Sequence, residues 1–300
     1  MMKRFPHYQS YERGPIEFKS RIHKKEGEIM TIARKPLVTA TPSTPIKECM
    51  RLMVSNSIRR LLILRPGTMK LEGVVRSRDF VNLFGGGEKY KLVEGKFGGN
   101  FYAVINEPVK SIMETKFPTG NIYMSIQDAV KTLLQTGVGG LPVLNDDGDV
   151  VGVVSERDLI SLIPATTGRT AGYYMTRHVI TIEPETPIGE AARRMTSFRV
   201  RRVPVVKDKD LAGIVTTVDI MKYFGSSKVF EFMKSQRMDE ALSVPTQEIM
   251  TREVLKATPE MDAGEVAALM REKGCGGLPV MSDGALAGII TEHDLLRLLA

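Results

Sequence analysis

The stretch GVVSERD at residues 152–158 decides the fold of this chain, because variants of it occur four times. In every copy a glycine and two apolar residues precede a short segment that ends in aspartate, and an apolar helical pattern follows. Each copy therefore predicts a buried strand that leads into the start of a helix. Fourfold repetition of such a segment indicates an architecture built from repeated units. The other copies are GVVRSRD at 73–79, GIVTTVD at 213–219 and GIITEHD at 288–294.

Each copy lies at the end of a longer repeated unit. Upstream of it, apolar residues recur with a helical period, as at Ile46, Met50 and Met53, which predicts a helix with one buried face. A short apolar segment, such as LPVM at 278–281, then predicts a central strand. The first strand of each unit is expected at residues 37–39, 117–119, 179–181 and 254–256.

The sequence therefore predicts an α/β fold of four tandem strand–helix–strand–strand–helix units. One unit of this size buries too little surface to be stable alone, so the units are expected to pack in pairs. A basic arm precedes the first unit. The expected boundaries are 1–31 for the arm and 32–84, 109–163, 171–224 and 246–299 for the four repeats.

The residues before the central strand alternate between two kinds. Repeats 1 and 3 carry an arginine pair there, at 59–60 and 201–202, whereas repeats 2 and 4 carry a glycine pair, at 139–140 and 276–277. The alternation predicts two modules, repeats 1+2 and repeats 3+4. Each module is expected to have a pseudo-two-fold axis, with the apolar helix stripes facing each other across it. The glycines permit a tight turn or a close approach of the backbone to a ligand.

The second arginine of each pair is a candidate ligand of an anion. An arginine pair beside a buried strand is usually solvated surface, but its recurrence in alternate repeats favours a function. A guanidinium group forms two parallel hydrogen bonds with a phosphate. We therefore expect Arg60 and Arg202 to reach a phosphate bound by the glycine-bearing repeat of the same module.

The composition is that of a soluble globular protein, with 42% hydrophobic and 26% charged residues. No apolar run approaches the roughly 20 residues of a membrane span, and the N-terminus lacks the apolar core of a secretory signal. The two cysteines, Cys49 and Cys275, and the four histidines have no recognisable metal-binding spacing. These features predict a cytoplasmic protein with reduced thiols and no membrane association.

The basic residues are concentrated near the N-terminus. Residues 1–35 contain nine Lys/Arg and four Glu, so they hold most of the net charge of +7. An arm of this kind binds nucleic acid or an acidic partner in some proteins, and it is a solvated tail in others. The sequence leaves both interpretations open.

The chain resembles the cystathionine-β-synthase (CBS) domain family in its unit order, its Leu/Val-Pro-Val strand and its Gly-hydrophobic-x-Ser/Thr-x-x-Asp ending. The resemblance extends from about residue 32 to residue 300. Four repeats without another domain are similar to the nucleotide-sensing γ subunit of AMP-activated protein kinase and its archaeal stand-alone relatives. The resemblance implies paired CBS units whose clefts bind AMP, ADP, ATP or, in some members, S-adenosylmethionine.

The resemblance also implies roles for the residues of the repeated ending. The aspartate accepts hydrogen bonds from the ribose hydroxyls, the Ser/Thr contacts phosphate, and the first strand lines the adenine slot. Basic residues between the Ser/Thr and the aspartate lie near the phosphates. The corresponding residues are Ser155, Arg157 and Asp158 in repeat 2, Ile180, Thr181, Thr216 and Asp219 in repeat 3, and Thr291, His293 and Asp294 in repeat 4.

The same ending also has a purely structural interpretation as a helix capping box, with the hydroxyl at the N-cap and the aspartate in the first turn. Both interpretations can hold together, because a helix start also suits a phosphate. Repeat 1 departs from the pattern, since Arg76 replaces the hydroxyl residue before Asp79. Arg76 either fills the cleft or binds phosphate itself. With Arg60 and Arg202 as phosphate ligands, repeats 4 and 2 are expected to bind best and repeat 1 least.

The sequence thus predicts a non-catalytic adenine-nucleotide sensor that regulates an unidentified partner protein. No nucleophile–base pair, metal cluster or P-loop is evident, so neither enzyme activity nor a cofactor is expected, and AMP, ADP or ATP is the expected ligand. A homodimer would repeat the two-module assembly. Two alternatives stay open: a sensor of another adenosyl ligand such as S-adenosylmethionine, and a nucleic-acid-associated protein that uses the basic arm.

Overall fold

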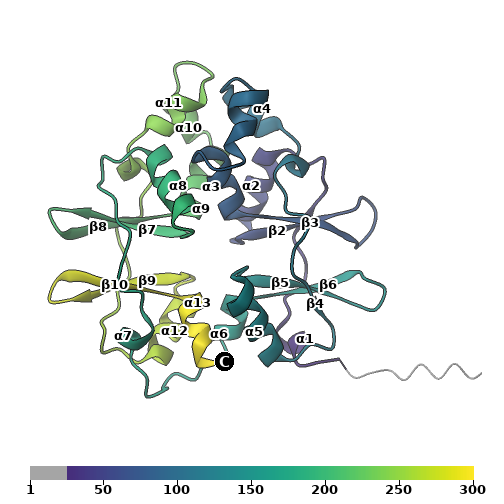
Figure 1. Ribbon diagram of the computed structural model, residues 1–300, viewed down its shortest axis with the longest axis vertical. Helices are drawn as coiled ribbons and strands as arrows, with labels where there is room; N and C mark the ends of the chain where they lie inside the picture. The colour runs from purple at the N-terminus through teal and green to yellow at the C-terminus, as the bar shows by residue number, and fades with distance from the viewer. Residues whose placement is uncertain (1–25) are drawn as a thin grey trace, which may run out of the picture.

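Four similar α/β units and the connections between them make up residues 26–300, the part of the chain that the computed structural model describes (Figure 1). Repeats 1 and 2 form one half of the molecule, and repeats 3 and 4 form the other. In each half the two sheets lie toward the middle, and the helices lie above and below them. The predicted α/β class and pairing of units are confirmed. Residues 1–25, and with them most of the predicted basic arm, lie outside the described residues.

Each repeat contains an antiparallel strand pair that is preceded and followed by a helix. Repeat 1 has β1 (Thr39–Ala40), α2 (Ile46–Ser55), β2 (Arg60–Leu64), β3 (Leu71–Arg76) and α3 (Ser77–Phe84). Repeat 2 has β4 (Gly120–Asn121), α5 (Ile126–Thr136), β5 (Gly140–Leu144), β6 (Val150–Ser155) and α6 (Glu156–Ile160). Repeat 3 has α8 (Ile188–Ser197), β7 (Arg202–Lys207), β8 (Asp210–Thr216) and α9 (Thr217–Gly225). Repeat 4 has α12 (Ala263–Glu272), β9 (Gly277–Ser282), β10 (Ala285–Thr291) and α13 (Glu292–Leu295).

Shorter helices lie outside this common pattern. Two of them, α1 (Ile29–Ile32) and α7 (Ala171–Tyr174), lie at the starts of repeats 1 and 3. The single 3-10 turns are η2 (Val109–Ser111), η3 (Thr246–Glu248) and η4 (Leu296–Leu298). Among residues 26–300, no helix has both the length and the apolar character that crossing a membrane requires.

The first strand of each unit lies about two residues beyond its predicted position. β1 pairs in parallel with β2, and β4 pairs in parallel with β5. In repeats 3 and 4 the strand is a single parallel bridge, at Ile182 and at Ala257. The apolar residues that suggested the earlier positions, such as Leu37 and Phe117, instead pack where the sheets of repeats 1 and 2 meet.

The segment that enters each repeat crosses to the sheet of the other repeat in its module. The backbone N–H of Arg34 donates to the carbonyl of Val153, and that of Val74 donates to the carbonyl of Glu114, each at 2.9 Å. The equivalent bridges between repeats 3 and 4 are Thr176–Ile289 and Ile214–Thr251. This exchange joins repeat 1 to repeat 2 and repeat 3 to repeat 4, as the alternating arginine and glycine pairs predicted.

The helices pack between the modules, and here the prediction was wrong. α2 and α3 of repeat 1 pack against α8 and α9 of repeat 3, and one apolar core joins the two repeats. The rings of Phe84 and Phe224 stack in this core with their centroids 4.0 Å apart. A second core joins repeats 2 and 4. The apolar helix stripes thus face the other module and not the other repeat of the same module. The helical period identifies the buried face of a helix but does not identify the helix that packs against it.

The connections inside the two modules also meet each other, at the top of Figure 1. After repeat 1 come the π-helical turn η1 (Leu92–Lys96) and α4 (Phe101–Asn106); after repeat 3 come α10 (Lys228–Glu231) and α11 (Met238–Ser243). The backbone N–H of Phe101 donates to the carbonyl of Gln236 at 2.8 Å, and that of Met238 donates to the carbonyl of Gly99 at 2.8 Å. The modules are therefore joined both by the helices of the repeats and by these connections.

Candidate functional site

The repeated ending forms a capping box at a helix start in repeats 2, 3 and 4. Repeat 1 has only half of it: the backbone N–H of Arg76 donates to Oδ2 of Asp79 at 2.8 Å, but the guanidinium group of Arg76 cannot accept a hydrogen bond in return. The backbone N–H of Thr291 donates to Oδ2 of Asp294 at 2.9 Å, and that of Thr216 donates to Oδ2 of Asp219 at 2.8 Å. The structural interpretation of the motif is thus confirmed. The contact with the backbone at the helix start uses Oδ2 of each aspartate. The repeats differ in what the other carboxylate oxygen, Oδ1, contacts.

In repeat 1 the aspartate is paired with two cations of the protein itself. Nη2 of Arg76 donates to Oδ1 of Asp79 at 2.9 Å, and Nζ of Lys89 donates to the same oxygen at 2.7 Å. Burial alone would raise the pKa of Asp79. The two cations lower it by more than burial raises it, so the pKa lies below its ordinary value. Arg76 therefore pairs with Asp79, and this carboxylate is not free to accept hydrogen bonds from a ligand.

In repeat 2 the aspartate is paired with a residue from repeat 1. Arg34 forms an ion pair with Oδ1 of Asp158. The side chain of Asp158 is only 6% exposed, whereas that of Arg34 is 61% exposed. A ligand that uses Asp158 would therefore have to displace Arg34 from the opening of this site.

Among residues 26–300, the aspartates of repeats 3 and 4 form weaker contacts with cations than those of repeats 1 and 2. No hydrogen bond or ion pair within residues 26–300 engages Oδ1 of Asp219, and burial raises the pKa of this carboxyl group. Oδ1 of Asp294 has only Arg297 nearby, whose half-exposed Nη2 is 3.8 Å away. Asp219 and Asp294 are thus the two carboxylates that remain available to a ligand.

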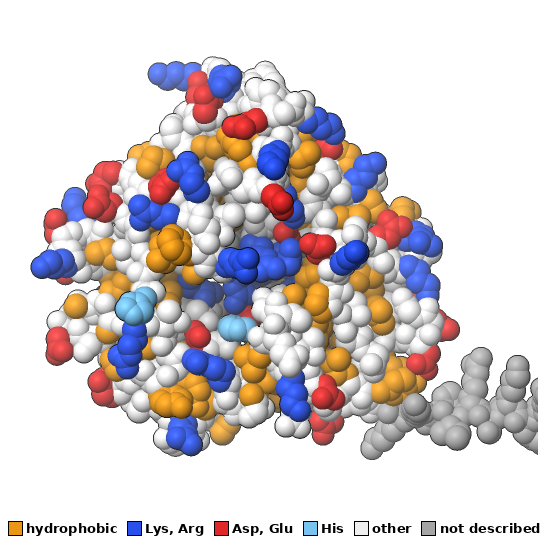
Figure 2. Space-filling model, in the orientation of Figure 1, with side chains coloured by type: hydrophobic (Ala, Val, Ile, Leu, Met, Phe, Trp, Pro, Cys, Tyr) orange, Lys and Arg blue, Asp and Glu red, His pale blue; other side chains and the backbone are white. Residues whose placement is uncertain are grey.

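A cavity of about 800 Å³, lined by residues of all four repeats, opens in the middle of the molecule. Figure 2 shows this hollow with Lys and Arg side chains gathered in it. The carboxylate of Asp294 shares the cavity with the apolar side chains of Val179 and Ile180 from the start of repeat 3. The predicted site residues that line it are Asp79, Ile180, Arg202, Thr291, His293 and Asp294. Those outside this lining are Arg60, Ser155, Arg157, Asp158, Thr181, Thr216 and Asp219.

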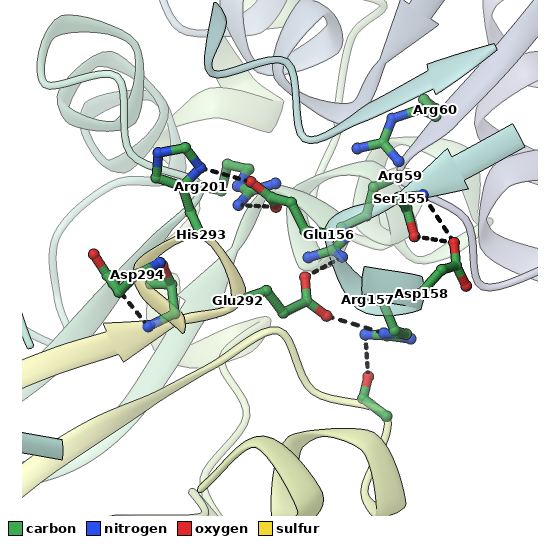
Figure 3. A network of polar contacts seen from close by, with 12 residues as sticks. Arg59, Arg60, Ser155, Glu156, Arg157, Asp158, Arg201, Glu292, His293 and Asp294 are labelled. Carbon is green, nitrogen blue, oxygen red and sulfur yellow. Dashed lines mark hydrogen bonds and ion pairs between the residues drawn. The ribbon is translucent and has the colours of Figure 1, made fainter. Parts of the chain in front are cut away.

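A charged network lies where the four repeats meet (Figure 3). Glu156, the first residue of α6, is 1% exposed. It accepts a hydrogen bond from Nη2 of Arg201 at 2.8 Å, and its other oxygen lies 2.9 Å from Nδ1 of His293. Although burial raises the pKa of Glu156, these partners lower it more, and the carboxylate in turn raises the pKa of His293. The three side chains join repeats 2, 3 and 4.

Glu292, the equivalent residue of repeat 4, is fully buried and makes the reciprocal contacts. It forms an ion pair with Arg59 of repeat 1 and a second with Nε of Arg157 of repeat 2, at 3.0 Å. Arg157 also donates to the carbonyl of Gly274 at 2.8 Å. Burial raises the pKa of Glu292, and the two arginines lower it below its ordinary value. Arg157 is therefore a residue of the interface between repeats 2 and 4.

Cations outnumber carboxylates in this network. Within the described residues, Arg60 and Arg202 have no carboxylate partner, and Nε of Arg60 is buried without a hydrogen bond. Burial and the neighbouring arginines lower the pKa of Arg60 to about 10 and that of Arg202 to about 9. Buried charge is unfavourable unless an opposite charge balances it. The centre of the molecule is therefore suited to an anion.

The glycine pairs make room for these two arginines. A Cβ atom on Gly140 would overlap the guanidinium group of Arg60, and a Cβ atom on Gly277 would overlap that of Arg202. Each arginine therefore reaches the glycine-bearing repeat of its own module, as predicted. The arginine pair of one repeat thus contacts the glycine pair of the other repeat in the same module. A role for these arginines in binding phosphate stays a prediction.

Replacing Gly277 with alanine is expected to destabilise the protein, because the added methyl group displaces Arg202. Overpacking of this kind costs about 1–3 kcal/mol, which urea denaturation would detect as a lower midpoint. Gly95→Ala is the control, since a Cβ atom there has nothing within 4 Å. Equal midpoints for the two variants would contradict the role assigned to Gly277.

Comparison with known proteins agrees with this architecture. The family model for the CBS domain matches residues 27–86, 109–165, 171–226 and 247–300. The uncharacterized protein MJ1225 of Methanocaldococcus jannaschii is 36% identical over 276 residues, which cover 91% of this chain and 99% of that protein. The crystal structure of MJ1225, presented as a candidate archaeal homologue of g-AMPK, matches with a TM-score of 0.86. A 33.4 kDa protein encoded in a ribosomal RNA operon of Thermofilum pendens is 30% identical over 88% of both chains.

Proposed function

Because this chain belongs to the CBS domain family, we propose that it is a non-catalytic sensor of adenine nucleotides. CBS domains typically bind adenosyl ligands such as AMP and S-adenosylmethionine in regulatory roles. The observation that carries the proposal is the central cavity, in which the carboxylate of Asp294, an apolar wall and several arginines share one space.

Each part of an adenine nucleotide has a matching group in this cavity. The adenine ring would lie against Val179 and Ile180, and the ribose hydroxyls would donate to Oδ1 of Asp294. A carboxylate oxygen accepts such bonds readily, because it has two lone pairs and no proton. The phosphate would then reach Arg201 and Arg202, whose guanidinium groups suit phosphate oxygens.

The charge of the cavity favours a phosphate over a sulfonium group. Six Lys/Arg and four Asp/Glu side chains line it, together with His178 and His293. S-adenosylmethionine would add a positive charge to this excess, whereas a nucleotide would reduce it. The nucleic-acid alternative depends on the basic arm, of which residues 1–25 are outside the described part of the chain.

Calorimetric titration of the full chain with AMP, ADP, ATP and S-adenosylmethionine tests the proposal. We expect the nucleotides to bind and to raise the melting temperature, because a ligand at 100 times its Kd adds about 2.7 kcal/mol of stability. Absence of binding by all three nucleotides at millimolar concentration would contradict the proposal, and so would tighter binding of S-adenosylmethionine. Salt-dependent binding of DNA or RNA that is lost on deletion of residues 1–30 would support the nucleic-acid alternative instead.

The proposal includes a regulatory output. A nucleotide in the central cavity would contact repeats from both modules, so its binding would change the relative stability of their arrangements. We expect that change to alter the affinity for a partner protein or for a second copy of the chain. A partner that binds equally well with and without nucleotide would not be the regulated one.

A further inference from the structure

The cavity contains a second group of arginines beyond the expected position of the first phosphate. Arg78, in the first turn of α3, and Arg199, shortly before β7, both line the cavity and are exposed to it. Within residues 26–300, neither guanidinium group forms a hydrogen bond or an ion pair. Their neighbours Arg76 and Lys89, in contrast, are both paired with Asp79. Neither arginine is therefore directly paired with a carboxylate of residues 26–300, although Asp79 lies within electrostatic range of Arg78.

Arg201 connects this second group to the available carboxylate. Asp294 lies within electrostatic range of Arg201. Arg201 and Arg199 lie within electrostatic range of Arg78. A ligand whose ribose is bound at Asp294 would thus place its first phosphate near Arg201. Any further phosphates would extend toward Arg78 and Arg199.

The length of the phosphate chain decides how many of these arginines a ligand contacts. Lys and Arg side chains that gather in one hollow, as in Figure 2, repel one another in the free protein. A monophosphate bound near Arg201 and Arg202 offsets only part of this repulsion. A longer chain that also contacts Arg78 and Arg199 offsets more of it and forms additional charge-assisted hydrogen bonds.

We propose that Arg78 and Arg199 form a subsite for the distal phosphates of a ligand bound at Asp294, so that the cavity prefers a nucleoside triphosphate to the monophosphate. The inference rests on the proposed nucleotide function and adds the ligand class and the residues that select it. The adenine and ribose positions lie at other residues, Ile180 and Asp294. Loss of the two arginines is therefore expected to weaken the binding of ligands with several phosphates and to leave the recognition of adenosine unchanged.

The test is calorimetric titration with AMP and with ATP, performed on the wild type and on the double variant Arg78→Ala/Arg199→Ala. The expected result is that the double variant binds ATP about tenfold or more weakly, since each lost bond involves charged groups, and binds AMP as the wild type does. The control is Arg51→Ala/Arg237→Ala, which removes the same charge from two arginines outside the cavity lining. It is expected to leave both affinities unchanged.

Inorganic tripolyphosphate provides a second measurement on the same proteins. It is expected to displace ATP from the wild type and to compete less well in the double variant. Equal affinity of wild type and double variant for ATP would overturn the inference, and so would an equal loss of AMP and ATP binding. Failure of the wild type to bind any adenine nucleotide would instead reject the proposed function on which the inference rests.

Discussion

Replacing Asp294 with alanine is expected to weaken nucleotide binding by about 10- to 150-fold, because it removes hydrogen bonds to a charged group, which contribute about 1.5–3 kcal/mol. Within residues 26–300, the nearest ion-pair partner of Oδ1 of Asp294 is Nη2 of Arg297, 3.8 Å away. Oδ2 is bonded to the backbone and the hydroxyl of Thr291, at 2.9 and 2.7 Å. The ligand would therefore lose its ribose contact, and calorimetric titration with AMP would measure the loss.

Asp79→Ala is the matched control for this variant. It removes the aspartate at the same position of repeat 1, where Arg76 and Lys89 already occupy the carboxylate. We expect it not to weaken AMP binding, because no ribose contact is lost and the cavity, which Asp79, Arg76 and Lys89 line, becomes more positive. The account would be wrong if Asp79→Ala abolished binding while Asp294→Ala bound AMP normally.

Replacing Glu292 with alanine is expected to reduce the free energy of unfolding by about 3–5 kcal/mol, the range for breaking a buried ion pair by removing one partner. The side chain of Glu292 is 0% exposed, and that of its partner Arg59 is 16% exposed. The variant leaves Arg59 and Arg157 without a carboxylate at an interface that joins repeats 1, 2 and 4. It also adds to the excess of positive charge at the centre of the molecule, where Arg60 and Arg202 already have no carboxylate partner among the described residues.

Urea denaturation would measure this loss of stability. Asp239→Ala is the matched control, because it removes a carboxylate from an ion pair with Arg237 in which both side chains are about 60% exposed. Pairs of this kind contribute little to stability, so the control is expected to unfold like the wild type. A Glu292→Ala protein with the same midpoint as the control would show that the buried network does not hold the repeats together.

The elements of each repeat and the pairing of repeats into modules could be predicted from the sequence. The period of Ile46, Met50 and Met53 identifies a buried helix face, and all three residues are buried. The alternation of arginine and glycine pairs identifies the modules, because each glycine pair receives a guanidinium group from the neighbouring repeat. Local spacing thus determines the elements and their buried faces. Which repeats share a helical core depends on the shape of the assembled units, and periodicity carries no information about it.

The contacts that distinguish the four helix starts could not be predicted in the same way. Arg34 and Asp158 are 124 positions apart, so no local pattern joins them. Lys89 comes from the connection after repeat 1, which has no counterpart in the repeat pattern. Glu156 and Glu292 stand in first helical turns, where a solvated carboxylate is the usual expectation. They are buried because Arg59, Arg157 and Arg201 of other repeats reach them. Of these three, only Arg157 was a predicted site residue, and it was expected near a phosphate.

A crystal structure of the full chain with AMP tests the central claim most directly. The account predicts the ribose hydroxyls about 2.5–3.0 Å from the carboxylate of Asp294, the range of a hydroxyl hydrogen bond. It also predicts the adenine against Val179 and Ile180 and the phosphate beside Arg201 and Arg202. A central cavity without AMP, or AMP whose ribose contacts a different helix start while Asp294 remains free, would contradict it.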